Sequence, residues 1–199
     1  MDNNIDVNEQ LKIKNQEMLL NKKMIDIDTS IESFLEFFNN YSTLNIAGEI
    51  NNKICSYHNI DPSSEKGRIL YNTITSFFFI MIRKLKEIFK ENIEPLKQKL
   101  RVIDDIEYNK ELSHIYTVIN NKMTEYCSEK IVELNNELTN GVSEETRIII
   151  EKYLSEMIIV RMLNTFKEKF AFYIHLINNN NEVNQEKMES INEKTIKGV

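Results

Sequence analysis

Apolar side chains recur at intervals of three and four residues along almost the whole chain. This spacing places them on one face of an α-helix. Only four glycines and two prolines interrupt the pattern in 199 residues. The sequence therefore predicts an all-α protein, a single-domain bundle of five to seven helices.

The start and end of one long helix are marked in the middle of the chain. Asp61 can cap a helix, and Pro62 suits the first helical position because its missing N–H would have no partner there. Pro95 removes a backbone hydrogen bond and clashes with the preceding turn. We expect a helix over about residues 62–92 that ends or kinks at Pro95.

This helix is also the most hydrophobic part of the chain. One apolar stripe runs from Leu70 to Ile88, and Phe78, Phe79, Ile80 and Ile82 cover the remaining sides of its middle. A helix that is apolar all round is normally buried. We therefore expect it to be the central helix, surrounded by the others.

Two stripes with seven-residue spacing predict a first helix over about residues 7–25; they are Leu11, Met18 and Ile25, and Ile13, Leu20 and Ile27. This helix is either a short arm for self-association or a peripheral helix that lies across the bundle. Thr29 and Glu32 match a capping box and predict that a second helix begins at Thr29.

Further stripes predict a short helix over about residues 44–57 and helical segments from residue 96 to residue 138, with a break near Asp104. Asn140 and Gly141 form a left-handed stop, and Ser143 caps a last helix over about residues 144–177. Its apolar stripe includes Leu154, Met157, Val160 and Leu163.

These boundaries predict one domain with loose ends. We expect residues 1–178 to form a single all-helical domain, in which residues 1–28 are an N-terminal arm or peripheral helix. Residues 179–199 have little apolar content, and we expect them to be a mobile C-terminal tail.

The composition indicates the cellular compartment and the type of genome, but it does not indicate the function. The two cysteines are far apart, the first residues do not resemble a signal peptide, and the longest apolar run, residues 77–82, is too short to cross a bilayer. These features predict a cytoplasmic protein without a transmembrane segment. Abundant isoleucine, asparagine and lysine indicate an AT-rich genome.

The acidic residues near position 104 are the best candidates for metal chemistry. Glu111 and His114 have the spacing of the Glu-x-x-His step in di-metal helical bundles, and Asp104, Asp105 and Glu107 lie just before them. Because no second Glu-x-x-His pair occurs, we expect no metal and no cofactor. An all-α metal-dependent enzyme that uses these five residues is an alternative.

A basic stretch suggests another alternative, a nucleic-acid-binding accessory protein. Its cationic residues are Arg83, Lys84, Lys86, Lys90, Lys97, Lys99 and Arg101. Three glutamates are interleaved with them, and the net charge of the chain is −6, so a solvated helical face explains the stretch as well.

The segment from Leu44 to Asn51 resembles the Leu-x-x-x-Gly-Asp motif of the B-cell-lymphoma apoptosis regulators. Gly67-Arg68-Ile69 is similar to the Gly-Arg step of their groove-forming helix, and residues 123–126 fit their later helix. The interval between Gly48 and Gly67 has no room for the two groove helices that the family places there. The resemblance implies a helical groove protein as a further alternative.

The main hypothesis is a non-catalytic interaction or scaffold protein, which binds a protein partner or another copy of itself. It is based on an apolar surplus on several helices. The candidate partner-binding residues are Phe34, Phe37, Phe38, Phe166, Phe170 and Phe172.

Overall fold

A computed structural model describes residues 7–40, 43–99 and 105–173, which are helical apart from two turns and contain no β-strand. The elements are α1 (Val7–Asn40), α2 (Thr43–Tyr57), α3 (Glu65–Lys99), α4 (Asp105–Leu138), α5 (Glu144–Ser155) and the π-helix η1 (Glu156–Leu163), followed by α-helix over 164–173. The predicted all-α bundle is confirmed. The predicted tail, residues 179–199, lies outside the described residues.

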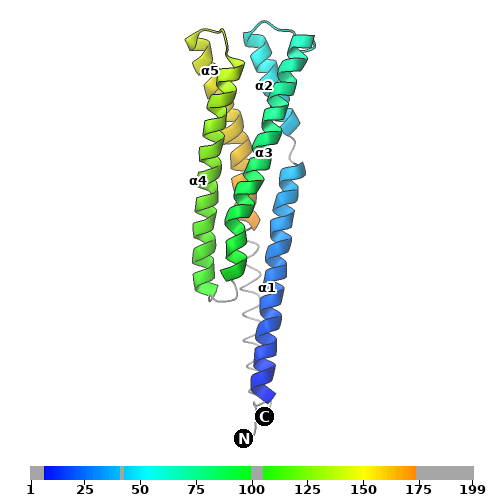
Figure 1. Ribbon diagram of the computed structural model, residues 1–199, viewed down its shortest axis with the longest axis vertical. Coiled ribbons are helices and arrows are strands. Elements are labelled where there is room, and N and C mark those ends of the chain that lie inside the picture. Colours follow the sequence, from blue (N-terminus) through cyan, green and yellow to red (C-terminus); the bar gives the residue numbers. More distant parts are fainter. Residues whose placement is uncertain (1–6, 41–42, 100–104, 174–199) are drawn as a thin grey trace.

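The helices form an elongated bundle of antiparallel rods (Figure 1). α2 packs against the first half of α3, and α1 against its second half, so these two helices together occupy one side of the bundle. α4 packs along α3, and α5 with η1 completes the bundle against α4. α1 runs along the bundle axis and extends beyond the ends of α3 and α4, so the expectation that it lies across the bundle was wrong.

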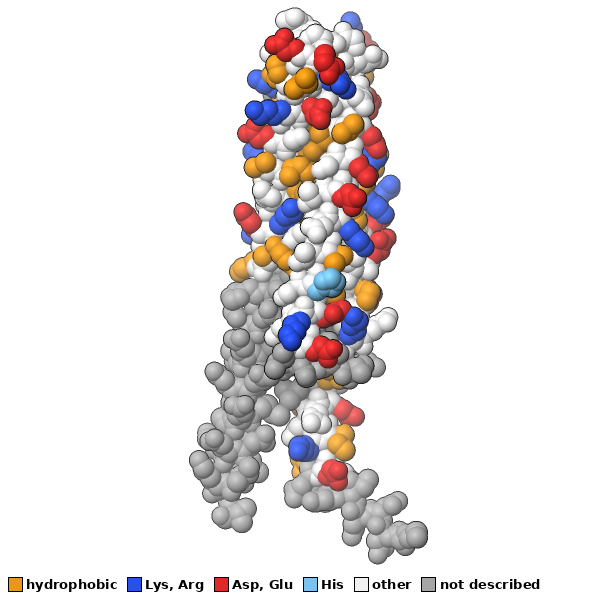
Figure 2. Space-filling model, turned by 90° about the vertical axis from the view of Figure 1, so that its left-hand side faces the viewer, with side chains coloured by type: hydrophobic (Ala, Val, Ile, Leu, Met, Phe, Trp, Pro, Cys, Tyr) orange, Lys and Arg blue, Asp and Glu red, His pale blue; other side chains and the backbone are white. Residues whose placement is uncertain are grey.

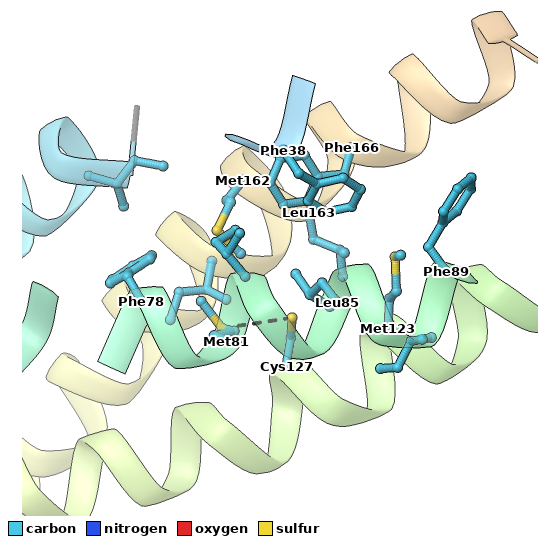
Figure 3. Close-up of a cluster of buried hydrophobic side chains, with 14 of the residues drawn as sticks. Phe38, Phe78, Met81, Leu85, Phe89, Met123, Cys127, Met162, Leu163 and Phe166 are labelled. Carbon is cyan, nitrogen blue, oxygen red and sulfur yellow. Dashed lines mark hydrogen bonds between the residues drawn. The ribbon is translucent and has the colours of Figure 1, made fainter. Parts of the chain in front are cut away.

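A continuous apolar core runs through the bundle, and Figure 3 shows its middle. Phe78, Met81 and Leu85 of α3 are fully buried between α4 and the last helix. Cys127 of α4 lies with its sulfur 4.0 Å from that of Met81. At a typical 1.5–3 kcal/mol for each large side chain buried, this shared core is the main source of stability.

The predicted helix start at Thr29 was wrong, because α1 continues through this position. Thr29 Oγ1 donates a hydrogen bond to the carbonyl oxygen of Ile25, at 2.9 Å, as in a helix interior. Met24, Ile31 and Phe38 are spaced by seven residues across Thr29, and all three contribute to the core. A break at Thr29 would turn these three side chains away from the core. The free energy gained by burying them is larger than that of the local capping interaction.

The start of α3 was predicted three residues too early. Asp61 Oδ1 accepts hydrogen bonds from the backbone N–H and the hydroxyl of Ser63, so Asp61 stabilises the turn that precedes the helix. Ser64 is the capping residue, because its Oγ accepts from the N–H of Gly67 at 3.2 Å.

The helix was expected to end or kink at Pro95, and it does not end there, since α3 passes through Pro95 and continues to Lys99. Ile93 and Leu96, on either side of the proline, are both buried in the core. Their packing compensates for the backbone hydrogen bond that Pro95 cannot make.

The turn before α5 matches its prediction. Gly141 has a φ of +82°, which is the left-handed conformation that ends α4. Ser143 then caps α5, with its Oγ accepting from the N–H of Thr146.

Candidate functional site

A hollow lies along the outward face of α3, where α3 meets the end of α4. Its upper part, of about 350 Å³, is lined by His58, Ile60, Lys66, Ile69, Leu70, Thr73, Glu137 and Leu138. Its lower part, of about 470 Å³, is lined by Ile69, Asn72, Thr73, Ser76, Phe77, Ile80 and Glu137. Because the two parts share Ile69, Thr73 and Glu137, they form one depression, which we call the α3 groove.

The side-chain order on α3 explains the shape of the groove. Ile69, Thr73, Ser76 and Ile80 follow one another at spacings of four, three and four residues, which aligns them on one face of the helix. The small side chains of Thr73 and Ser76 leave a depression between the two larger isoleucines.

The exposure of several α3 side chains contradicts the expectation that other helices surround α3 on all sides. Ile69, Phe79 and Ile80 are 59%, 58% and 53% exposed, whereas Phe78 and Ile82 are buried. α3 is therefore one of the outer rods of the bundle, and several of its apolar side chains face solvent.

The upper end of the groove is held in place by the turn between α2 and α3. A ring nitrogen of His58, Nε2, lies 2.9 Å from the carbonyl oxygen of Leu138 and ties this turn to the end of α4. Gly67 is buried so closely under the turn that an added Cβ would lie 2.5 Å from the carbonyl oxygens of Asp61 and Pro62. The groove is thus built on packed, hydrogen-bonded elements, as a preformed binding surface requires.

Charges at the margins of the groove are mixed. Lys66 and Glu137 both line its upper part. Below it, Lys84 Nζ lies 3.1 Å from Glu87 Oε2, and this hydrogen bond raises the pKa of the lysine. The groove has isoleucines at its ends and small hydroxyl residues between them, and neither sign of charge dominates its margins, so it suits an amphipathic helix better than an anion.

The six phenylalanines predicted to bind a partner do not form a surface. Phe34, Phe38, Phe166 and Phe170 are buried, Phe37 is half-buried, and only Phe172 is mainly exposed. Ring centroids lie 4.3 Å apart for Phe38 and Phe166, and 4.6 Å for Phe34 and Phe89. These rings join the first and last helices of the bundle, and this packing accounts for the apolar surplus seen in the sequence.

Three of the basic residues proposed for nucleic-acid binding already pair with other side chains of the protein. Lys84 pairs with Glu87, Lys86 bonds to Asn39 of α1, and Lys99 pairs with Glu111 of α4. Arg83 and Lys90 are exposed, Lys97 lies in α3, and Arg101 falls outside the described residues. Figure 2 shows acidic and basic side chains interleaved along the α4 and α5 side of the bundle, so that side also lacks a cationic field.

The candidate metal ligands do not converge in the described part of the chain. The salt bridge and hydrogen bond from Lys99 occupy Glu111 and lower the pKa of its carboxyl group. Glu107 and His114 are exposed on α4, which begins at Asp105, and Asp104 lies outside the described residues. In residues 7–40, 43–99 and 105–173, no three His, Cys, Asp or Glu side chains gather where they could hold a metal ion.

The first half of α1 carries the exposed stripe predicted from its seven-residue spacing, formed by Leu11, Met18 and Ile25. In Figure 1 this half of α1 extends past the ends of α3 and α4. No helix in the described ranges is long and apolar enough to cross a bilayer.

The segments that resemble the apoptosis regulators have other structural roles. Leu44–Asn51 belongs to α2, where Ile46, Ala47 and Ile50 are buried in the core, and Gly67 accommodates the turn before α3. No family model matches this chain, and no curated protein or solved structure resembles it closely enough to count as a match.

Sequence reasoning missed the groove itself. It assigned Phe79 and Ile80 to the core and did not consider Thr73 or Ser76. The available signal was a second stripe, Ile69–Thr73–Ser76–Ile80, on the face of α3 opposite the buried stripe that includes Ile74, Phe78, Met81 and Leu85.

Proposed function

We propose that this protein is a non-catalytic interaction protein that binds an α-helix in the α3 groove. The observation that carries the proposal is the exposure of Ile69 and Ile80 at the two ends of a depression. Apolar side chains contiguous on a surface are typical of protein-binding sites, and anchors at helical spacing are typical of helix-in-groove recognition.

The size of the groove supports a helical ligand. From Lys66 to Ile80 the lining residues of α3 extend over about 21 Å at 1.5 Å per residue, or nearly four helical turns. An amphipathic segment of similar length could place two or three apolar anchors against Ile69, Phe77 and Ile80.

Photo-crosslinking in the native cells tests the proposal. A benzophenone amino acid at Ile80 should form a covalent adduct with a protein, whereas the same group at exposed Lys152 on α5 should not. A second substitution, Ile69→Lys, should abolish the Ile80 adduct and leave the helical content and Tm unchanged, because Ile69 is exposed. Failure to detect any Ile80-specific protein adduct would refute the proposal.

A further inference from the structure

We infer that the helix bound in the α3 groove is α3 of a second copy of this chain, packed antiparallel about a two-fold axis. This inference rests on the proposed function and names its partner.

The order of residue types along the groove is almost the same in both directions of α3. Its central residues are Ile69, Thr73, Ser76 and Ile80, with a large apolar residue at each end and a small hydroxyl residue at each inner position. An antiparallel pair centred between residues 74 and 75 therefore places Ile69 against Ile80 of the second copy, and Thr73 against Ser76 of the second copy. One isologous contact satisfies both copies.

The inner and flanking positions suit such a pair. Small residues at 73 and 76 let the two helices approach closely, and their hydroxyl groups can hydrogen-bond across the axis. Leu70 and Phe77 lie on the α4 side of the groove, about 7 Å and about 4 Å from the axis along the helix. Each therefore comes within about 3 Å, along the helix direction, of the level of the other in the second copy, which extends the apolar contact.

Charges at the two ends of the groove are complementary in this register. Glu65 and Arg83 project from the same side of α3, since 18 residues make five full helical turns. Glu65 is about 9.5 residues from the axis and Arg83 is about 8.5, so Glu65 comes within about 1.5 Å, along the helix direction, of the level of Arg83 in the second copy, twice per dimer. Lys66 comes near Lys84 of the second copy, but Glu87 already pairs with Lys84, and Glu137 lines the groove beside Lys66.

The length of the contact predicts a modest affinity. Ile69 and Ile80 are about 17 Å apart along the axis, so one helix pair of this length belongs to the small class of specific interfaces, below about 1,200 Å². We expect a dimer that forms at high protein concentration and dissociates on dilution.

Sedimentation velocity over a concentration series is the first test. The wild-type chain should shift from monomer to dimer as concentration rises. Thr73→Lys should remain monomeric, because it places two ammonium groups near the axis. Asn121→Lys adds the same charge on an exposed position of α4, and this control should behave like the wild type. Wild-type protein that stays monomeric throughout would overturn the inference.

Disulfide trapping tests the orientation. Ile69→Cys and Ile80→Cys are made in two chains with tags of different mass and are then mixed under mild oxidation. The antiparallel register predicts a 69–80 heterodimer. Neither variant should crosslink alone, because like positions lie about 17 Å apart and a disulfide tolerates less than about 7 Å between Cα atoms. Crosslinks at 69–69 and 80–80 would instead require a parallel pair and refute the proposed arrangement.

The native thiols give little background in this experiment. Cys55 and Cys127 are buried, and burial raises the pKa of Cys127 to about 12.

Sedimentation and photo-crosslinking together separate the proposed function from the proposed self-association. A monomeric protein that still gives an Ile80 photo-adduct with a different protein would retain the proposed function and exclude self-association.

Discussion

Two glycines that occupy helical positions have opposite surroundings. An added Cβ on Gly48, in α2, would meet no atom within 4 Å. At Gly67, near the start of α3, the same atom would collide with two backbone carbonyl oxygens at 2.5 Å. Gly48 only weakens its helix, whereas Gly67 is required for the turn that borders the groove.

Substitution by alanine should therefore have opposite effects at these two sites. Gly48→Ala should stabilise the protein by up to about 1 kcal/mol, because alanine is the better helix former and the site has space. Gly67→Ala should destabilise it by about 1–3 kcal/mol, because backbone atoms must move. Urea unfolding measures both changes. A loss of stability for Gly48→Ala would contradict the open space around this residue.

Among the helices, hydroxyl side chains have different roles at two positions that both match a helix-start motif. Thr29 lies inside α1 and bonds to the carbonyl oxygen one turn earlier, whereas Ser143 caps a real helix start. The difference depends on whether the apolar stripe continues through the position. It continues through Thr29 and is interrupted by the turn before Ser143.

Alanine substitutions distinguish a cap from a helix interior. Ser143→Ala should cost about 1 kcal/mol, because the N–H of Thr146 loses its acceptor. Thr29→Ala should be neutral or stabilising by up to about 0.5 kcal/mol, because alanine has the higher helix propensity. Thermal unfolding of the two variants provides the comparison. A loss near 1 kcal/mol for Thr29→Ala would indicate a helix start within α1.

The last helix contains a wide turn that sequence spacing did not predict. Val160 was expected in the apolar stripe but is 59% exposed, while Ile158 and Met162 are buried in its place. In η1 the N–H of Asn164 bonds to the carbonyl oxygen of Ile159, five residues earlier. This wider turn rotates the following residues so that Leu163 and Phe166 face the core.

At the scale of the whole molecule, a cluster of aromatic rings connects the two ends of the described chain. Phe34 and Phe38 of α1 contact Phe89 of α3 and the rings of Phe166 and Phe170. Phe34 and Phe38 are more than a hundred positions away from Phe166 and Phe170 in the sequence. Folding of this end of the bundle therefore requires α1 and the last helix to assemble on α3.

Two phenylalanines near the end of the chain provide a test of this role. Phe166→Ala should destabilise the protein by about 3–5 kcal/mol, because it leaves a cavity in the core. Phe172→Ala should cost less than about 1 kcal/mol, because this ring is 53% exposed. Denaturant unfolding measures both. If Phe166→Ala left the stability unchanged, Phe166 would belong to a surface, as the sequence first suggested.

Residue spacing and local motifs were enough to predict the all-α class, the helical periodicity of the apolar positions, and the stop at Gly141 followed by the cap at Ser143. These features are local, because helix periodicity and capping depend on residues within one or two turns. For the same reason the sequence could predict which side chains of α3 share a face.

Which apolar faces are covered depends on the packing of the helices against one another. Phe166 and Ile80 are both apolar residues on amphipathic helices, yet Phe166 packs against α1 whereas Ile80 faces solvent beside the groove. Likewise, helix continuity through Thr29 and Pro95 and the π turn at η1 were set by contacts with distant elements. Burial depends on which helices become neighbours, and residue spacing within one helix does not contain that information.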